Sequence, residues 1–111
     1  MGVRGALALI ALAGPCSALT ATCEGDGWSL ALQGAQAEFV FPAPTQMDVP
    51  HVAQAEGAHW PRALTLIGDR DTGIVILHDR ACATGTHEAQ ILTQRAQTPM
   101  LLTGCCRDVS E

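Results

Sequence analysis

Lysine and tyrosine are both missing from this chain. Its six basic residues are all arginines and stand against 11 acidic residues, so the formal net charge is −5 with histidine neutral. A chain of this sign is repelled by nucleic acid and by anionic membrane surfaces, which argues against both as partners and favours basic proteins. After the first twenty residues, no apolar run is long enough to cross a bilayer as a helix.

Motifs for covalent catalysis are also missing. No serine sits in a Gly-x-Ser-x-Gly elbow, and no cysteine is left to act as a nucleophile if the exported cysteines pair with one another. His87 and Glu88 are adjacent, but neighbours on a strand point to opposite faces and cannot easily share one substrate atom. We therefore expect no enzyme activity and no cofactor.

The N-terminus has the organisation of a secretory signal peptide. Arg4 supplies a positive start, and residues 6–13 form an apolar stretch that is too short to span a membrane. Small residues precede Ala18, which predicts cleavage there, with Ala21 as a second choice. Pro15 argues against lipid attachment at Cys16. The signal is thus predicted over residues 1–18 and one small domain over residues 19–111, in the periplasm or secreted.

Four cysteines remain in the exported chain, namely Cys23, Cys82, Cys105 and Cys106. In an oxidising compartment they predict two disulfides. A bridge between the neighbours Cys105 and Cys106 would need a strained peptide, so each must reach upstream. We predict Cys82–Cys105 and Cys23–Cys106, because the bridge over the last hairpin region takes the cysteine in the body of the strand. The last cysteine then ties down the N-terminus.

Period-two patterning dominates the exported chain and predicts strands over residues 28–33, 37–41, 64–67, 74–77, 87–94 and 100–106. Met47, Val49 and Val52 are consistent with a further short edge strand, broken by Pro50. Residues 74–77 are apolar on both faces and predict a central strand. Six or seven strands joined by turns predict an all-β antiparallel meander that closes into a small barrel or rolled sheet, stapled by two disulfides. Its expected core is Trp28, Leu30, Phe39, Phe41, Leu64, Leu66, Ile74, Ile76, Ile91 and Leu102.

Several short motifs carry a family resemblance. Cys23, the segment Trp28-Ser29-Leu30, the pair Phe39 and Phe41, Cys82 and the segment Leu102-Thr103-Gly104-Cys105 occur in this order. The pattern resembles a family of small bacterial envelope (periplasmic) proteins, similar in shape to the eight-stranded barrels of the periplasmic inhibitors of c-type lysozyme. The Ser-Gly-x-x-Tyr loop that those inhibitors insert into the lysozyme cleft has no counterpart here.

Two ion-binding interpretations compete with simpler ones. His78, Cys82 and His87 are spaced so that strand and loop could gather them around zinc or copper, with Cys105 or Cys106 as a further ligand. Cysteines held as cystines explain the same residues without a metal. Residues 69–73 echo the start of a calcium loop but lack its later acidic ligands, which favours an ordinary hairpin turn.

The remaining candidate for a contact is the segment His59-Trp60-Pro61-Arg62. An exposed Trp60 beside Arg62 would make a contact patch for a partner protein, whereas a buried Trp60 would cap one end of the barrel. The leading functional hypothesis is a non-catalytic, exported binding or inhibitor-like module, expected as a monomer, whose partner is a basic protein such as a lysozyme. The alternative is a periplasmic metal-handling protein that uses His78, His87 and reduced cysteines.

Overall fold

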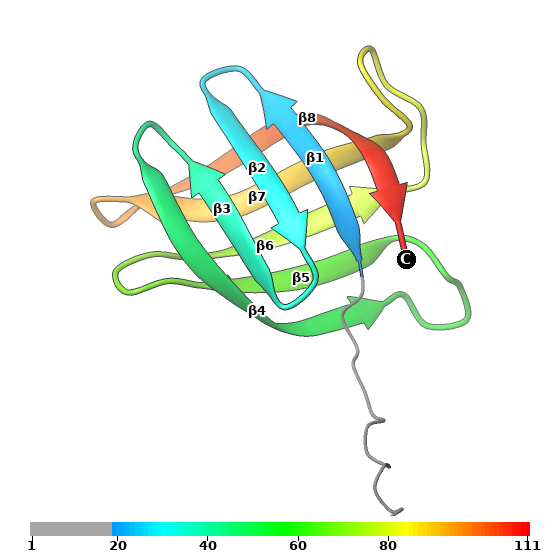
Figure 1. Cartoon of the computed structure of the whole chain (residues 1–111), viewed down its shortest axis with the longest axis horizontal. Helices are drawn as coiled ribbons and strands as arrows, with labels where there is room; N and C mark the ends of the chain where they lie inside the picture. The colour runs from blue at the N-terminus through cyan, green and yellow to red at the C-terminus, as the bar shows by residue number, and fades with distance from the viewer. Residues whose placement is uncertain (1–18) are drawn as a thin grey trace, which may run out of the picture.

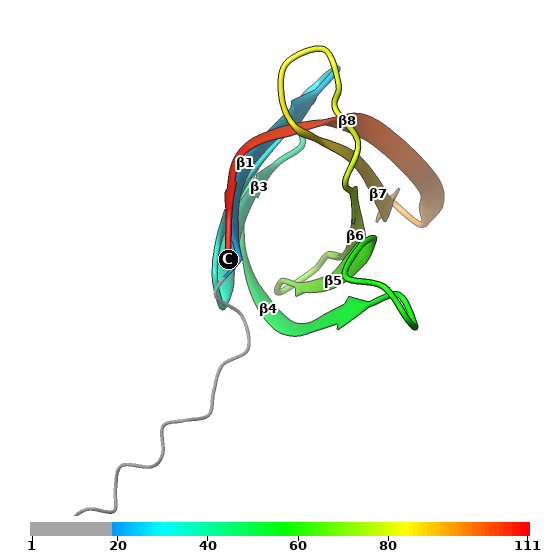
Figure 2. The same ribbon diagram turned by 90° about the vertical axis from the view of Figure 1, so that its right-hand side faces the viewer.

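The computed structural model describes residues 19–111, so the predicted signal peptide lies outside the described residues. Within this range the chain forms strands and contains no helix long and apolar enough to cross a membrane (Figure 1). Each strand pairs antiparallel with the next along the chain, and β8 pairs with β1, so the sheet closes into a barrel (Figure 2). The strands are β1 (Thr20–Gly25), β2 (Trp28–Gln33), β3 (Gln36–Val40), β4 (Pro44–Gln54), β5 (Arg62–Ile67), β6 (Thr72–His78), β7 (His87–Arg95) and β8 (Thr98–Ser110).

Alternate residues of the strands fill the interior of the barrel. Successive side chains of a strand point to opposite faces, so the period-two pattern places one set inside. The predicted all-β barrel is therefore confirmed. The large side chains with less than 2% of their surface exposed all belong to this inner set: Leu30, Leu32, Leu64, Leu66, Leu77, Ile91, Val75, Cys23 and Cys106.

Two strands differ from the sequence-based prediction. β1 was not predicted, because Thr20–Gly25 alternates small and polar residues with only one cysteine of any bulk. β4 is a continuous strand of 11 residues, so the prediction of a short edge strand broken at Pro50 is wrong. The register between β4 and β5 shifts between Asp48 and His51, and this irregularity accommodates Pro50, which has no amide hydrogen to donate. A closed barrel also leaves no edge strand.

The predicted core is correct except on β6. Ile74 is 40% exposed, whereas Val75 and Leu77 are fully buried. In the register, Val75 lies beside Leu64 of β5 and Ile91 of β7, which both face inward. Because the neighbouring strands set the face, Ile74 and Ile76 point outward and are wrong as core residues. Phe41 and Leu102 are partly buried against the core.

Both predicted disulfides are present. Cys106 bridges Cys23, its direct partner in the β1–β8 pairing, and both side chains are fully buried inside the barrel. Cys105 bridges Cys82, in the loop over residues 79–86 that stands above the outside of the barrel in Figure 2. The two bridges leave β8 on opposite faces because neighbouring side chains of a strand alternate.

The indole of Trp28 lies over two glycines at the junction of β1 and β8. Gly25 and Gly104 are register partners, and a Cβ atom at Gly104 would stand 2.5 Å from Cζ2 of Trp28 and 2.2 Å from the carbonyl oxygen of Glu24. The indole Nε1 donates a hydrogen bond of 3.2 Å to the carbonyl oxygen of Thr103. Only residues without a side chain leave room for a buried tryptophan at this junction.

Candidate binding surfaces

Residues 19–61 form the acidic half of the barrel and contain β1 to β4. This half carries five carboxylates and no arginine or lysine; the five are Glu24, Asp26, Glu38, Asp48 and Glu56. Residues 62–111 carry five arginines and six carboxylates, so they are close to neutral. Most of the negative charge is therefore concentrated on one side of the molecule.

Glu38 and Asp48 are the acidic residues on the outer face of β3 and β4. In the register, Glu38 lies between Ala31 of β2 and Gln46 of β4, which are both uncharged. Asp48 accepts a hydrogen bond of 3.3 Å from Nε2 of Gln36. Neither carboxylate forms an ion pair within residues 19–111. Both are exposed and can meet a cation from a partner.

Three of the six carboxylates of residues 62–111 lie within ion-pair distance of an arginine, and a fourth lies near a histidine. Glu88 pairs with Arg80 at 2.6 Å, and Asp79 lies 3.5 Å from Nε2 of His87. Arg107 reaches across the junction of β8 and β1 to Glu24 at 3.4 Å. The arginines thus offset the negative charge of their own side of the barrel and that of Glu24 at the β1–β8 junction. The other carboxylates of the acidic half remain exposed to solvent.

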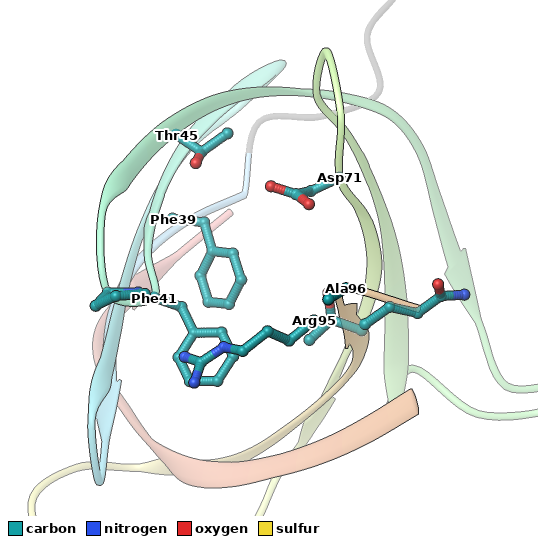
Figure 3. A pocket seen from close by; sticks show the side chains of 9 residues that line it. Phe39, Phe41, Thr45, Asp71, Arg95 and Ala96 are labelled. Atoms are coloured by element: carbon teal, nitrogen blue, oxygen red, sulfur yellow. The ribbon is translucent and has the colours of Figure 1, made fainter. Parts of the chain in front are cut away.

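The mouth of the barrel is a concave site at the end where the β3–β4, β5–β6 and β7–β8 turns gather. It is a cavity of about 320 Å³ whose lining includes Phe39, Phe41, Pro42, Thr45, Asp71 and Arg95. Figure 3 shows the two phenylalanine side chains on one side of the opening and Asp71 across from them. The rings of Phe39 and Phe41 are stacked at 5.9 Å between centroids.

A guanidinium lies above the aromatic part of the mouth. Cζ of Arg95 is 4.0 Å from the centre of the Phe41 ring, which is within cation–π distance (Figure 3). No carboxylate among residues 19–111 lies within ion-pair distance of Arg95. The mouth therefore combines apolar rings with one unpaired cation and with Asp71 on the opposite rim.

The opposite end of the barrel holds the predicted contact residues Trp60 and Arg62. The structure brings the two together, with Cζ of Arg62 at 4.8 Å from the centre of the Trp60 ring. Arg62 is only 8% exposed, and its Nε donates a hydrogen bond to the carbonyl oxygen of His59. Trp60 packs partly buried against the core, with the His87 ring 4.6 Å away. This arrangement has the geometry of a cap on the barrel.

Glu111 completes the cap from the last strand. Its carboxylate accepts hydrogen bonds from Nε2 of His59, at 2.9 Å for one oxygen, and from the Arg62 guanidinium. These two hydrogen bonds, the one from His59 first, hold the pKa of the Glu111 carboxyl below its ordinary range. The ionised form of Glu111 therefore stabilises the cap that Trp60 and Arg62 form.

The two histidines of the metal hypothesis point to opposite faces. His87 contacts Trp60 and lies on the inner side, whereas His78 lies on the outer side, where its Nε2 is 3.1 Å from Oε1 of Gln90. All four cysteines of residues 19–111 are bridged, and no three histidine, cysteine or acidic side chains in this range are grouped as a metal site. The fold does not assemble the proposed ligands.

The turn over residues 68–71 is the hairpin that the sequence favoured. The amide of Gly68 donates a 2.8 Å hydrogen bond to the carbonyl oxygen of Asp71, which closes the chain between β5 and β6. Asp71 lines the mouth of the barrel. Its place is explained by the hairpin without an ion.

The chain matches no known family model, no curated protein and no solved structure. The mouth was missed in the sequence because Phe41, Asp71 and Arg95 come from three different hairpins. Their only shared signal is that each lies where a strand meets a turn. The exposed charge of the acidic half, in contrast, can be read directly from the lack of arginine in residues 19–61.

Proposed function

We propose that this protein is a non-catalytic, exported binding module of the bacterial envelope and that its partner is a basic protein bound on the acidic half. The observation that carries the proposal is the separation of charge: five carboxylates and no arginine or lysine in residues 19–61. A surface of one sign steers an oppositely charged partner toward it and excludes partners of the same sign.

The geometry of the acidic half fits this role. Glu38 and Asp48 lie on the outer face of paired strands, whose backbones are held rigid by the barrel. Preordered carboxylates lose little conformational freedom when a partner binds, which favours affinity. The two disulfides agree with an oxidising compartment, and the periplasm is the compartment that we propose.

A c-type lysozyme is the first partner to test, since it is a basic protein and since the sequence motifs resemble those of a family similar in shape to the inhibitor barrels. The absence of tyrosine means that an inhibitory loop of the Ser-Gly-x-x-Tyr kind cannot be the means of contact. We therefore propose that the partner docks on the exposed carboxylates of the acidic half. Binding of lysozyme should be measured separately from inhibition of its activity.

The experiment compares two double variants with the same change in charge. Glu38→Gln with Asp48→Asn removes two carboxylates from the acidic half, and Asp79→Asn with Asp108→Asn removes two from the other side. Exposed ion pairs contribute roughly 0.2–1 kcal/mol each, so the first variant should weaken binding by about 2- to 30-fold and the second much less. Binding is measured by calorimetry at low and high salt, and it should weaken with salt.

Two outcomes would count against the proposal. A panel of basic proteins that includes lysozyme, with no salt-sensitive binding at roughly 100 µM, would remove its basis. Equal weakening by the two double variants would show that net charge, and not the acidic half, attracts the partner.

A second candidate function rests on the mouth. The unpaired Arg95 guanidinium above Phe41 is suited to the carboxylate of a small aromatic acid, whose ring would pack on the phenylalanines. The probe is phenylpropionate, followed by chemical shifts of the Phe41 ring and the Arg95 side chain. Arg95→Gln should abolish the shifts, whereas Arg70→Gln, which removes the same charge from the adjacent turn, should preserve them. Saturable binding that survives Arg95→Gln would refute the assignment.

A further inference from the structure

Four large aliphatic side chains are strongly exposed among residues 19–111, and all four lie on the outside of β5 to β8. Ile67, Ile74, Leu92 and Leu101, which we call the apolar row, are 45%, 40%, 50% and 59% exposed. Leu92 is the register partner of both Ile74 and Leu101, so these three side chains lie side by side across three strands. Ile67 is paired with Thr72, two residues from Ile74.

Single exposed aliphatic residues are ordinary on protein surfaces, but an aligned group is not. The residues that surround Ile74, Leu92 and Leu101 on the same face carry no charge: Thr65, Thr72, Ile76, Gln90, Gln94, Pro99 and Thr103. Ile67, at the edge of the row, is the register partner of the carboxylate Asp48 on β4. The nearest charged side chain on this face of β7 is Glu88, which is paired with Arg80. Ile74, Leu92 and Leu101 thus lie in an uncharged part of this face on an acidic protein, and Asp48 borders the row beside Ile67.

We propose that the apolar row is the interface of a homodimer formed by two copies of this chain. This proposal is independent of the proposed function and replaces the sequence-based expectation of a monomer. The two copies are both acidic and repel each other in most orientations. They can approach most closely through Ile74, Leu92 and Leu101, because the carboxylates of the acidic half then point away from the contact, except for Asp48 at its edge.

The apolar row also suits the symmetry of a dimer. Most homodimers are related by a two-fold axis, which places the same patch of both copies face to face. An axis through Leu92, the middle member of the row, sets Leu92 against its own copy and keeps row against row. A partner of different sequence would need its own aligned aliphatic groups, whereas a second copy supplies them automatically.

The size of the face predicts a weak dimer. Four strands spaced about 4.8 Å apart, over six residues, give a face of roughly 20 Å by 20 Å. Standard interfaces bury about 800 Å² on each partner, so this face of roughly 400 Å² is about half of that size and corresponds to a transient contact. We expect association at roughly 10–100 µM and a monomer in dilute solution.

The first test is the mass of the disulfide-bonded chain in solution over roughly 5–500 µM, measured by analytical ultracentrifugation. The mass should rise toward twice the monomer mass. Salt should strengthen the association, because it screens the repulsion between two acidic copies. This is the opposite sign to the salt dependence of basic-partner binding, so the two proposals can fail separately. A chain that remains monomeric throughout this range overturns the dimer.

The second test uses variants matched in charge. Leu92→Glu places a carboxylate at the centre of the interface and should leave the protein monomeric at all concentrations. Gln33→Glu adds the same charge to the outer side of β2 and should associate like the wild type. Leu92 is half exposed, so neither change disturbs the core, and circular dichroism confirms the fold. Association of the Leu92→Glu variant at wild-type concentrations overturns the interface.

A third measurement tests the geometry of the interface at a protein concentration where the dimer forms. Leu92→Cys should form an intermolecular disulfide under mild oxidation, because the axis brings the two substituted positions together. Gln33→Cys serves as the control and should remain monomeric in the same time. Equal cross-linking of the two variants would indicate random collision and would overturn the interface.

Discussion

The two sides of the barrel share one kind of interior and have different exteriors. β1 to β4 expose carboxylates and polar side chains, whereas the outer face of β5 to β8 is apolar at its centre and carries Glu88 and Arg107 away from the apolar row. The inner residues of both sides are equally buried, because every strand must supply apolar side chains to the same closed core. The interior determines the fold, and the exterior is free to serve two different contacts.

The disulfides provide the largest expected effect in this comparison. Cys23–Cys106 closes the acidic half onto β8 and spans 83 residues, whereas Cys82–Cys105 spans 23. On the chain-entropy model, replacing both cysteines of the first bridge by alanine should cost about 4.5 kcal/mol and of the second about 3.5 kcal/mol. Urea unfolding of the two double variants measures both. A larger loss for the second pair would contradict this ranking.

The alternation of inner and outer residues on β6 gives the next effect. Leu77→Ala should cost about 3 kcal/mol, because the side chain is fully buried and leaves a cavity. Ile74→Ala should change the stability of the monomer by less than about 0.5 kcal/mol, since the side chain is exposed. Denaturant midpoints at low micromolar concentration test both. Similar losses at the two positions would mean that β6 does not present the faces described here.

Substitutions at two glycines allow the packing at the β1–β8 junction to be compared with the packing on β6. Gly104→Ala should cost about 2 kcal/mol, because its Cβ would overlap the Glu24 carbonyl and the Trp28 indole. At Gly73 the nearest atom to an added Cβ is 3.4 Å away, so Gly73→Ala should be tolerated within about 1 kcal/mol. Thermal unfolding followed by tryptophan fluorescence reads out both variants. A neutral Gly104→Ala would show that the indole has room to move.

The pH response of the cap is the smallest effect. The folded-state pKa of Glu111 lies below its ordinary value, so its contribution to stability is fully present above that value. The contribution is lost as the pH falls through the lowered folded-state pKa. Nuclear magnetic resonance should show the Glu111 carboxyl titrating below the ordinary range of a glutamate, and His59→Ala should raise the pKa of Glu111. An unchanged midpoint in that variant would separate Glu111 from His59.

Much of the fold could be predicted because local pattern and chemistry agree. Adjacent cysteines on one strand must face opposite ways, so Cys105 and Cys106 each specified a different partner. Residues 74–77, in contrast, are apolar at every position, and alternation alone could not tell Ile74 from Val75. The register with β5 and β7 decides between them, and register is a long-range property.

The candidate surfaces also differ in how far the sequence alone predicts them. The net negative charge is a property of composition and was predicted, and its concentration in residues 19–61 follows from the positions of the arginines in the sequence. The mouth depends on three hairpins that meet in space, and the apolar row depends on the cross-strand alignment of Ile74, Leu92 and Leu101. Both arise from tertiary pairing, which no single stretch of sequence contains.

The placement of the two disulfides on opposite faces of β8 has a consequence for reduction. Cys23 and Cys106 are inaccessible to solvent, whereas Cys82 lines an open groove on the outside of the barrel together with Cys105. A dilute thiol can reach the outer bridge and must wait for the barrel to unfold before it attacks the inner one. Mild reduction should therefore yield a species with two free thiols, in which the loop over residues 79–86 is released from a barrel that is still closed.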